Sequence, residues 1–131
     1  MNAHLPLFFL LATVLPGHVA AQIAHDLTVY SEDGLAFTLV VNGQTINAEP
    51  ASSVTASNIN FDHAKVVVRF VDEAIPPIER KNLQIATPGT GPKGPVAVVY
   101  AIKEKKGEMV VRFVSRSDKK IQNAPVIIIN N

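Results

Sequence analysis

The clearest constraint on the fold is a pair of alternating segments near the C-terminal end of the chain. Residues 96–103 and 109–114 alternate large apolar side chains with small or charged ones, which is the two-residue period of a β-strand. A short lysine- and glycine-containing turn separates them, as in many hairpins. Loops of two or four residues predict the same buried face, which consists of Val96, Val98, Tyr100, Ile102, Met109, Val111 and Phe113.

A similar hairpin is expected near the start of the domain. A three-residue loop at 32–34 would pair Val29 with Phe37 and Leu27 with Leu39, so that the large apolar side chains share one face. The same loop places its glycine at the left-handed position that such loops require. The sequence therefore predicts that residues 27–31 and 35–41 are hydrogen-bonded neighbours.

Two further signals follow directly. Asn42-Gly43 is a strong signal for a two-residue hairpin turn, and it would pair Leu39 with Ile46. The polar and β-branched residues around Val54 predict an edge strand.

The middle of the chain supplies one clear strand and one break. Lys65–Val71 alternates strictly and predicts a strand, whereas the two prolines in Ile75–Ile78 exclude a central strand there. Residues 78–86 predict either one helical turn or a short strand. No segment shows a convincing helical period. Seven to eight short strands with frequent turns predict an all-β domain, either a small antiparallel β-sandwich or an open barrel.

The N-terminal residues have a different character. Leu5–Leu15 is almost continuously apolar, but it is too short for a bilayer span, which needs about 20 residues. Val19 and Ala21 are suitably small for cleavage before Gln22, although Met1–His4 lacks the usual lysine or arginine. We therefore expect a signal peptide at 1–21 and a single β domain at 22–131. This predicts export to the periplasm, the cell surface or the medium, with no transmembrane segment after cleavage.

Composition limits the chemistry. The chain has no cysteine and a net charge of +1, which excludes disulfides and thiolate metal sites and does not favour nucleic acid as a partner. His25 and His63 are expected in exposed loops. No catalytic grouping and no cofactor are predicted, so a non-enzyme is favoured. An alternative is a metal-dependent carbohydrate binder or hydrolase that uses loop residues near Asp62 and His63.

Two groups of residues are candidate contacts. The second half of the chain is basic, and its predicted contacts with an anionic envelope glycan, a lipid phosphate or a partner protein are Lys105, Lys106, Arg112 and Arg116. The simpler interpretation is a solvated face with lysines that prevent sheet-to-sheet association. Residues 118–131 are predicted to form a terminal strand within the domain, or a strand donated to a partner, through Val126, Ile127, Ile128 and Ile129.

Residues 26–116 resemble a known family of domains. The ordered features are Ser31–Gly34, Phe37 and Leu39, Asn42-Gly43, Asn47 with Pro50, Val68–Asp72, and Lys81–Leu83. This pattern resembles the N-terminal β domain of small secreted Bacteroidota-type proteins of unknown function, here without their helical C-terminal domain. It is also distantly similar to PEGA-like envelope modules. The resemblance implies a β fold and no catalytic residue.

These observations together predict an exported, non-enzymatic β module with a binding or scaffolding role in the cell envelope. An envelope protein or an anionic glycan is the expected kind of partner. A subunit that pairs with a partner through its C-terminal strand is a further alternative.

Overall fold

A computed structural model describes residues 23–87 and 94–119 of the chain. This part contains eight strands and no helix, and therefore no helix that could cross a membrane. The predicted signal peptide at 1–21 and the segment Val126–Ile129 lie outside the described residues. The strands are β1 (His25–Ser31), β2 (Phe37–Val41), β3 (Gln44–Thr45), β4 (Ser53–Ile59), β5 (His63–Phe70), β6 (Ile78–Gln84), β7 (Val96–Lys105) and β8 (Glu108–Asp118).

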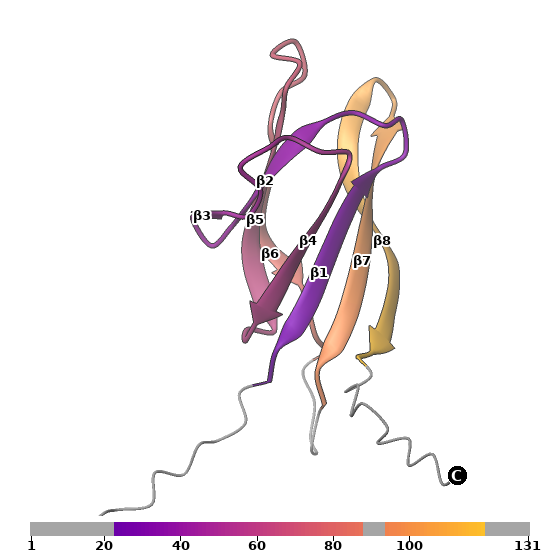
Figure 1. Ribbon diagram of the computed structural model, residues 1–131. Coiled ribbons are helices and arrows are strands. Elements are labelled where there is room, and N and C mark those ends of the chain that lie inside the picture. The colour runs from indigo at the N-terminus through magenta and orange to yellow at the C-terminus, as the bar shows by residue number, and fades with distance from the viewer. Residues whose placement is uncertain (1–22, 88–93, 120–131) are drawn as a thin grey trace, which may run out of the picture.

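The strands form two four-stranded sheets that face each other (Figure 1). One sheet has the order β4-β1-β7-β8 and the other has the order β3-β2-β5-β6. The sheets do not close into a barrel, and the predicted small all-β sandwich is confirmed. Strand pairing is antiparallel throughout except between β1 and β7, which run parallel.

The core lies between the two inner faces. Inward residues alternate with outward ones along the strands, as a period of two requires. Burying a side chain of valine, leucine or phenylalanine size contributes about 1.5 to 3 kcal/mol, so these residues supply most of the stability of a domain without disulfides. The largest fully buried side chains are those of Leu27, Val29, Phe37, Leu39, Val66, Val68, Leu83, Ile85, Val98 and Ile102.

The first predicted hairpin is wrong. β1 and β2 lie in opposite sheets, so Val29 does not pair with Phe37 across a ladder. The loop at 32–34 does turn the chain, and Gly34 has the expected positive φ of 71°. It then carries the chain across the sandwich, where the inner face of β2 packs against the inner face of β1.

The physical reason is that both edges of β1 are occupied by other strands. β4 pairs with one edge and β7 with the other, through Leu27↔Val98 and Val29↔Tyr100 on the β7 side. The predicted burial of Leu27, Val29, Phe37 and Leu39 is nevertheless correct, because a hairpin and a sheet crossing need the same alternation.

Other local predictions are confirmed. Asn42 (φ 48°) and Gly43 (φ 81°) form the two-residue turn, and the Ile46 amide donates to the Leu39 carbonyl over 2.9 Å. β4 is an edge strand that contains Val54, and β5 covers Lys65–Phe70 with the predicted alternation. Residues 78–84 form a strand rather than a helical turn.

The last hairpin is confirmed in outline and wrong at Phe113. Its turn is Lys106-Gly107, and Val98, Tyr100, Ile102 and Val111 are buried as predicted, with Val96 and Met109 half-buried. Phe113 is 53% exposed. Phe113 pairs with Tyr100, and the register shift follows it at Val114. β8 is the edge strand of its sheet, so the facing sheet does not fully cover the Phe113 ring.

Asn47 holds the end of β2 in place. Its Oδ1 accepts a hydrogen bond from the Leu39 amide over 2.8 Å. Its Nδ2 donates to the carbonyls of Phe37 and Glu49 over 2.9 and 3.0 Å. The side chain therefore takes the place of a neighbouring strand after the two-residue strand β3 ends. Asn47 therefore has a structural role.

We expect Asn47→Ala to lower the free energy of unfolding by about 2 kcal/mol, because three hydrogen bonds to backbone groups are lost, two of them half-buried. Urea denaturation of the protein measures this change. Gln44→Ala, at an exposed position of β3, is the control and should change stability by less than about 0.5 kcal/mol. Equal effects of the two substitutions would contradict the role of Asn47.

Candidate functional site

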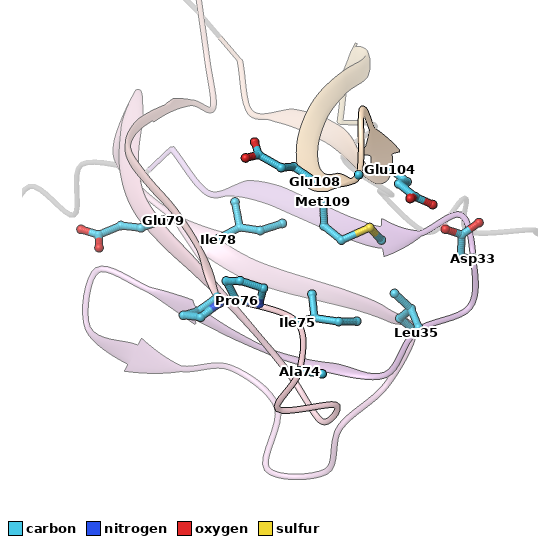
Figure 2. A pocket seen from close by; sticks show the side chains of 12 residues that line it. Asp33, Leu35, Ala74, Ile75, Pro76, Ile78, Glu79, Glu104, Glu108 and Met109 are labelled. Atoms are coloured by element: carbon cyan, nitrogen blue, oxygen red, sulfur yellow. The ribbon is translucent and has the colours of Figure 1, made fainter.

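A surface cavity lies at one end of the sandwich. The β5–β6 connection, the β7–β8 turn and the loop after β1 meet there, and they enclose a groove of about 610 Å³ (Figure 2). This volume falls within the range of about 300 to 1,000 Å³ that is usual for ligand pockets. We call this cavity the end groove; its lining is Asp33, Leu35, Ala74, Ile75, Pro76, Pro77, Ile78, Glu79, Glu104, Gly107, Glu108 and Met109.

The base of the end groove is apolar. Leu35, Ile75, Ile78 and Met109 are half-buried and pack against the hydrophobic core. Pro76 and Pro77 keep the connection between β5 and β6 out of the sheet, because a proline lacks the amide hydrogen that a central strand must donate. This connection therefore adds apolar surface to the groove, and it does not form a further strand that would cover the groove.

Four carboxylates surround this apolar base. Figure 2 shows Asp33 and Glu104 at one end of the groove, Glu79 at the other end, and Glu108 between them near Met109. Glu79 forms an exposed ion pair with Lys65, with Nζ and Oε1 3.5 Å apart. The other three carboxylates form no ion pair among the described residues. The groove lining itself contains no lysine, arginine or histidine.

Strand alternation separates the charges of the β7–β8 hairpin. Ile102 faces the core, so Glu104, two residues later, lies on the same inner face and opposite Met109. Lys103 and Lys105 lie on the outer face, and Lys103 pairs there with Glu32 over 3.2 Å. Glu108 lies opposite Lys105 on that outer face, so the hairpin turns Glu104 and Met109 toward the end groove and leaves Glu108 at its margin, beside the lysines.

Below the groove, side chains rather than backbone pairing join β6 and β8. Arg80 of β6 donates from Nη1 to the Val111 carbonyl over 2.9 Å. Arg116 of β8 donates from Nε to the Ile85 carbonyl over 2.9 Å and from Nη2 to the Gln84 carbonyl over 3.3 Å. These bonds close this side of the sandwich along most of its length.

Two aromatic rings reinforce the same edge. The Tyr100 hydroxyl also donates to the Gln84 carbonyl, and burial raises the pKa of Tyr100, so the hydroxyl keeps its proton. Phe113 contacts the Tyr100 ring edge-on at 5.8 Å between centroids. The Arg116 guanidinium lies 5.0 Å from the centre of the Phe113 ring.

The four predicted basic contacts do not form one patch. Lys105 and Lys106 lie at the turn, beside Glu104 and Glu108. Arg112 is exposed and lies four residues beyond Glu108 on β8, about 14 Å further along at roughly 3.4 Å per residue. Arg116 is half-buried, and its guanidinium is bound to backbone carbonyls and to Phe113. The structure therefore does not bring these cations together around a single anion.

We expect Arg116→Gln to destabilise the fold by about 2 kcal/mol, because charged hydrogen bonds to two carbonyls and the contact with Phe113 are lost. Arg112→Gln is the matched control on the same strand and should change stability by less than about 0.5 kcal/mol. Thermal or urea unfolding measures both. A larger loss for the Arg112 variant would show that the roles are reversed.

His25 is not an exposed loop residue as predicted. It begins β1, is 3% exposed, and its Nδ1 accepts a hydrogen bond from the Val96 amide over 3.0 Å. The prediction failed because the partner amide lies 71 residues away along the chain. A buried acceptor nitrogen must be unprotonated, so this histidine supports the β1–β7 pairing in its neutral form.

His63 begins β5 and is exposed. The Asp62 carbonyl accepts hydrogen bonds from the amides of Ile85 and Ala86, at 2.7 and 3.1 Å. No group of three or more histidine, aspartate or glutamate side chains gathers at Asp62 and His63 or elsewhere within residues 23–87 and 94–119. Within the described residues, the structure therefore brings no set of metal ligands together at Asp62 and His63, where the alternative interpretation places a metal-dependent site.

The structure predicts that His25 makes stability dependent on pH. Burial lowers the pKa of His25 from its ordinary value of 6.5; the charge of Lys119 lowers it further, while Asp62 and Asp26 oppose the shift. The unfolded chain then binds the proton more readily than the folded chain does. This contribution to stability is present above pH 6.5 and is lost as the pH falls through the folded-state pKa.

Urea denaturation between pH 7.5 and 5 tests this expectation. The wild type should lose stability as the solution is acidified, and His25→Gln should remove part of that slope. His63→Gln, at the exposed histidine, should leave the slope unchanged. An unchanged slope in the His25 variant would contradict the assigned role.

The sequence did not reveal the end groove. Its lining comes from three separate segments, the loop at 32–35, residues 74–79 and the β7–β8 turn. The one available signal was Ile75–Ile78, where apolar residues flank prolines that exclude a central strand and therefore need another use.

The chain matches no family model, and no curated protein or solved structure matches it. The functional argument therefore depends on the geometry of the end groove and on the sequence features described above.

Proposed function

We propose that this chain is an exported, non-enzymatic β module of the cell envelope that binds a partner protein in the end groove. The observation that carries the proposal is the groove itself, an apolar depression of about 610 Å³ with several carboxylates at its margin. Such a combination of apolar surface and a few polar groups is typical of binding sites. The apolar segment Leu5–Leu15 and the small residues before Gln22 support the export part of the proposal.

A binding role agrees with the distribution of titratable side chains. The buried histidine and tyrosine of the described residues, His25 and Tyr100, both hold strands together through backbone partners. The carboxylates of the end groove adjoin apolar side chains and Gly107 in its lining. These groups can recognise a partner by contact and charge. An anionic glycan is a poorer fit to this groove, because its charge would be repelled by the carboxylates.

A pair of glutamine substitutions tests the site. Met109→Gln keeps the side-chain length but makes the groove base polar, whereas Val71→Gln changes an apolar residue that is 59% exposed and outside the groove. The test is affinity capture from envelope extracts with quantitative mass spectrometry. The Met109 variant should recover about tenfold less of an identified partner than the wild type does, because losing one well-packed apolar contact costs about 1 kcal/mol or more. The Val71 variant should retain it.

Circular dichroism and thermal unfolding show whether both variants are folded. Retention of every partner by a folded Met109 variant would contradict binding in the end groove. Recovery of no protein by the wild type would also contradict the proposed function.

A second candidate is a subunit that pairs with a partner through residues 118–131. The supporting observation is that β8, with 11 residues, is an edge strand on which Phe113 and Val114 are 53% and 45% exposed. Truncation after Ala124 should then leave a folded monomer that no longer binds its partner. Global unfolding of the truncated protein would instead indicate a strand within the domain.

A further inference from the structure

We propose that the end groove binds an extended segment of a partner protein that carries both apolar and cationic side chains. This inference rests on the function proposed above and names the chemistry of the partner. It follows from three features of the groove: its apolar base, the sign of the charges around it, and the unpaired backbone of β8 beside it.

The apolar base determines what fills the groove. Leu35, Ile75, Ile78 and Met109 point into the same space from three different segments (Figure 2). They are continuous with the hydrophobic core, so they are held in position by packing before any partner arrives. A preformed apolar surface of this kind favours apolar side chains of the partner and loses little order on binding.

The charges select a cation. The groove lining contains Asp33, Glu79, Glu104 and Glu108 and no basic residue. Lys65 pairs with Glu79, and Lys105 lies opposite Glu108 on the neighbouring strand, whereas Lys103 pairs with Glu32 outside the lining. Asp33 and Glu104 lie together at one end of the groove, where their combined charge would attract lysine or arginine side chains and repel phosphate or carboxylate groups.

The free edge of β8 favours a peptide over other cations. The two-residue turn makes Lys105 and Glu108 a hydrogen-bonded pair, so the backbone groups of Met109 point away from β7. They lie beside the groove and form no hydrogen bond within the described residues. An extended segment could pair with them while it places alternate side chains on the apolar base, which is a recurrent mode of peptide recognition.

Three synthetic peptides test the proposal against the full mature protein. They share a Val-Leu-Val centre and carry lysine, glutamine or glutamate at both ends, with blocked termini. Titration followed by backbone amide shifts in NMR gives the affinity and the site. We expect the lysine peptide to bind about tenfold more tightly than the glutamine peptide at low ionic strength and the glutamate peptide to bind most weakly, with the difference shrinking in high salt.

Variants assign the effect to the groove. The double substitution Asp33→Asn/Glu104→Gln should remove most of the preference for lysine over glutamine and leave the affinity for the glutamine peptide unchanged. Glu49→Gln/Asp118→Asn removes the same number of charges from exposed positions outside the groove lining and should leave the preference intact. Shifts should be largest at Leu35, Ile75, Ile78 and Met109.

Contrary outcomes separate this proposal from the one on which it rests. Equal binding of all three peptides in the groove would overturn the cationic preference but keep the groove as a binding site. Shifts confined to residues outside the groove, or no binding of any peptide, would overturn the peptide proposal. NMR shifts of groove residues that depend on protein concentration alone would indicate that a second copy of the chain fills the groove. Contacts from Met109 to Ile127 or Ile129 would indicate that the chain's own C-terminal segment does. Either result would also overturn the peptide proposal.

Discussion

The parallel pairing of β1 with β7 is the interaction on which the rest of the sandwich depends. It joins residues about 70 positions apart in the chain, and the buried His25 accepts a hydrogen bond from Val96 at its start. With β4 on its other edge, β1 has no free side for β2. The chain must therefore cross to the opposite face after Ser31, and this crossing creates the second sheet and the core between the two. The same crossing places the loop at 32–35 beside the β7–β8 turn and so forms one wall of the end groove.

The two sides of the sandwich are closed by different means, which explains where the groove lies. On one side, a backbone bridge between Phe37 and Ala51 joins β2 to the segment before β4. On the other side, β6 and β8 are held by side-chain bonds from Arg80 and Arg116 to backbone carbonyls. Beyond Arg80 these bonds end, because the prolines before Ile78 interrupt the sheet. The apolar base of the groove is therefore the part of the core that no strand covers.

Much of the fold was predictable because alternation decides which side chains are buried. Leu27 and Phe37 were placed correctly in the core even though their strands were paired wrongly, since the pattern does not distinguish a hairpin from a crossing. The predicted burial of Phe113 is wrong because alternation does not show that β8 is an edge strand, where the facing sheet leaves the ring exposed. Arg116 was interpreted as a surface cation, and only the distant carbonyls of Gln84 and Ile85 reveal its role. The groove was not predictable, because its walls come from segments that only the tertiary structure brings together.

For a partner segment to pair with β8 as we propose, the outer edge of this strand at Met109, beside the end groove, must be open. Amide hydrogen exchange of residues 22–131, resolved by residue, measures whether this edge is open. The register predicts that the amides of Val110 and Arg112, which face β7, exchange slowly, and that those of Met109, Val111 and Phe113, which face away, exchange much faster. Protection of Met109, Val111 and Phe113 equal to that of their neighbours would contradict the claim, because another strand would then already occupy that edge.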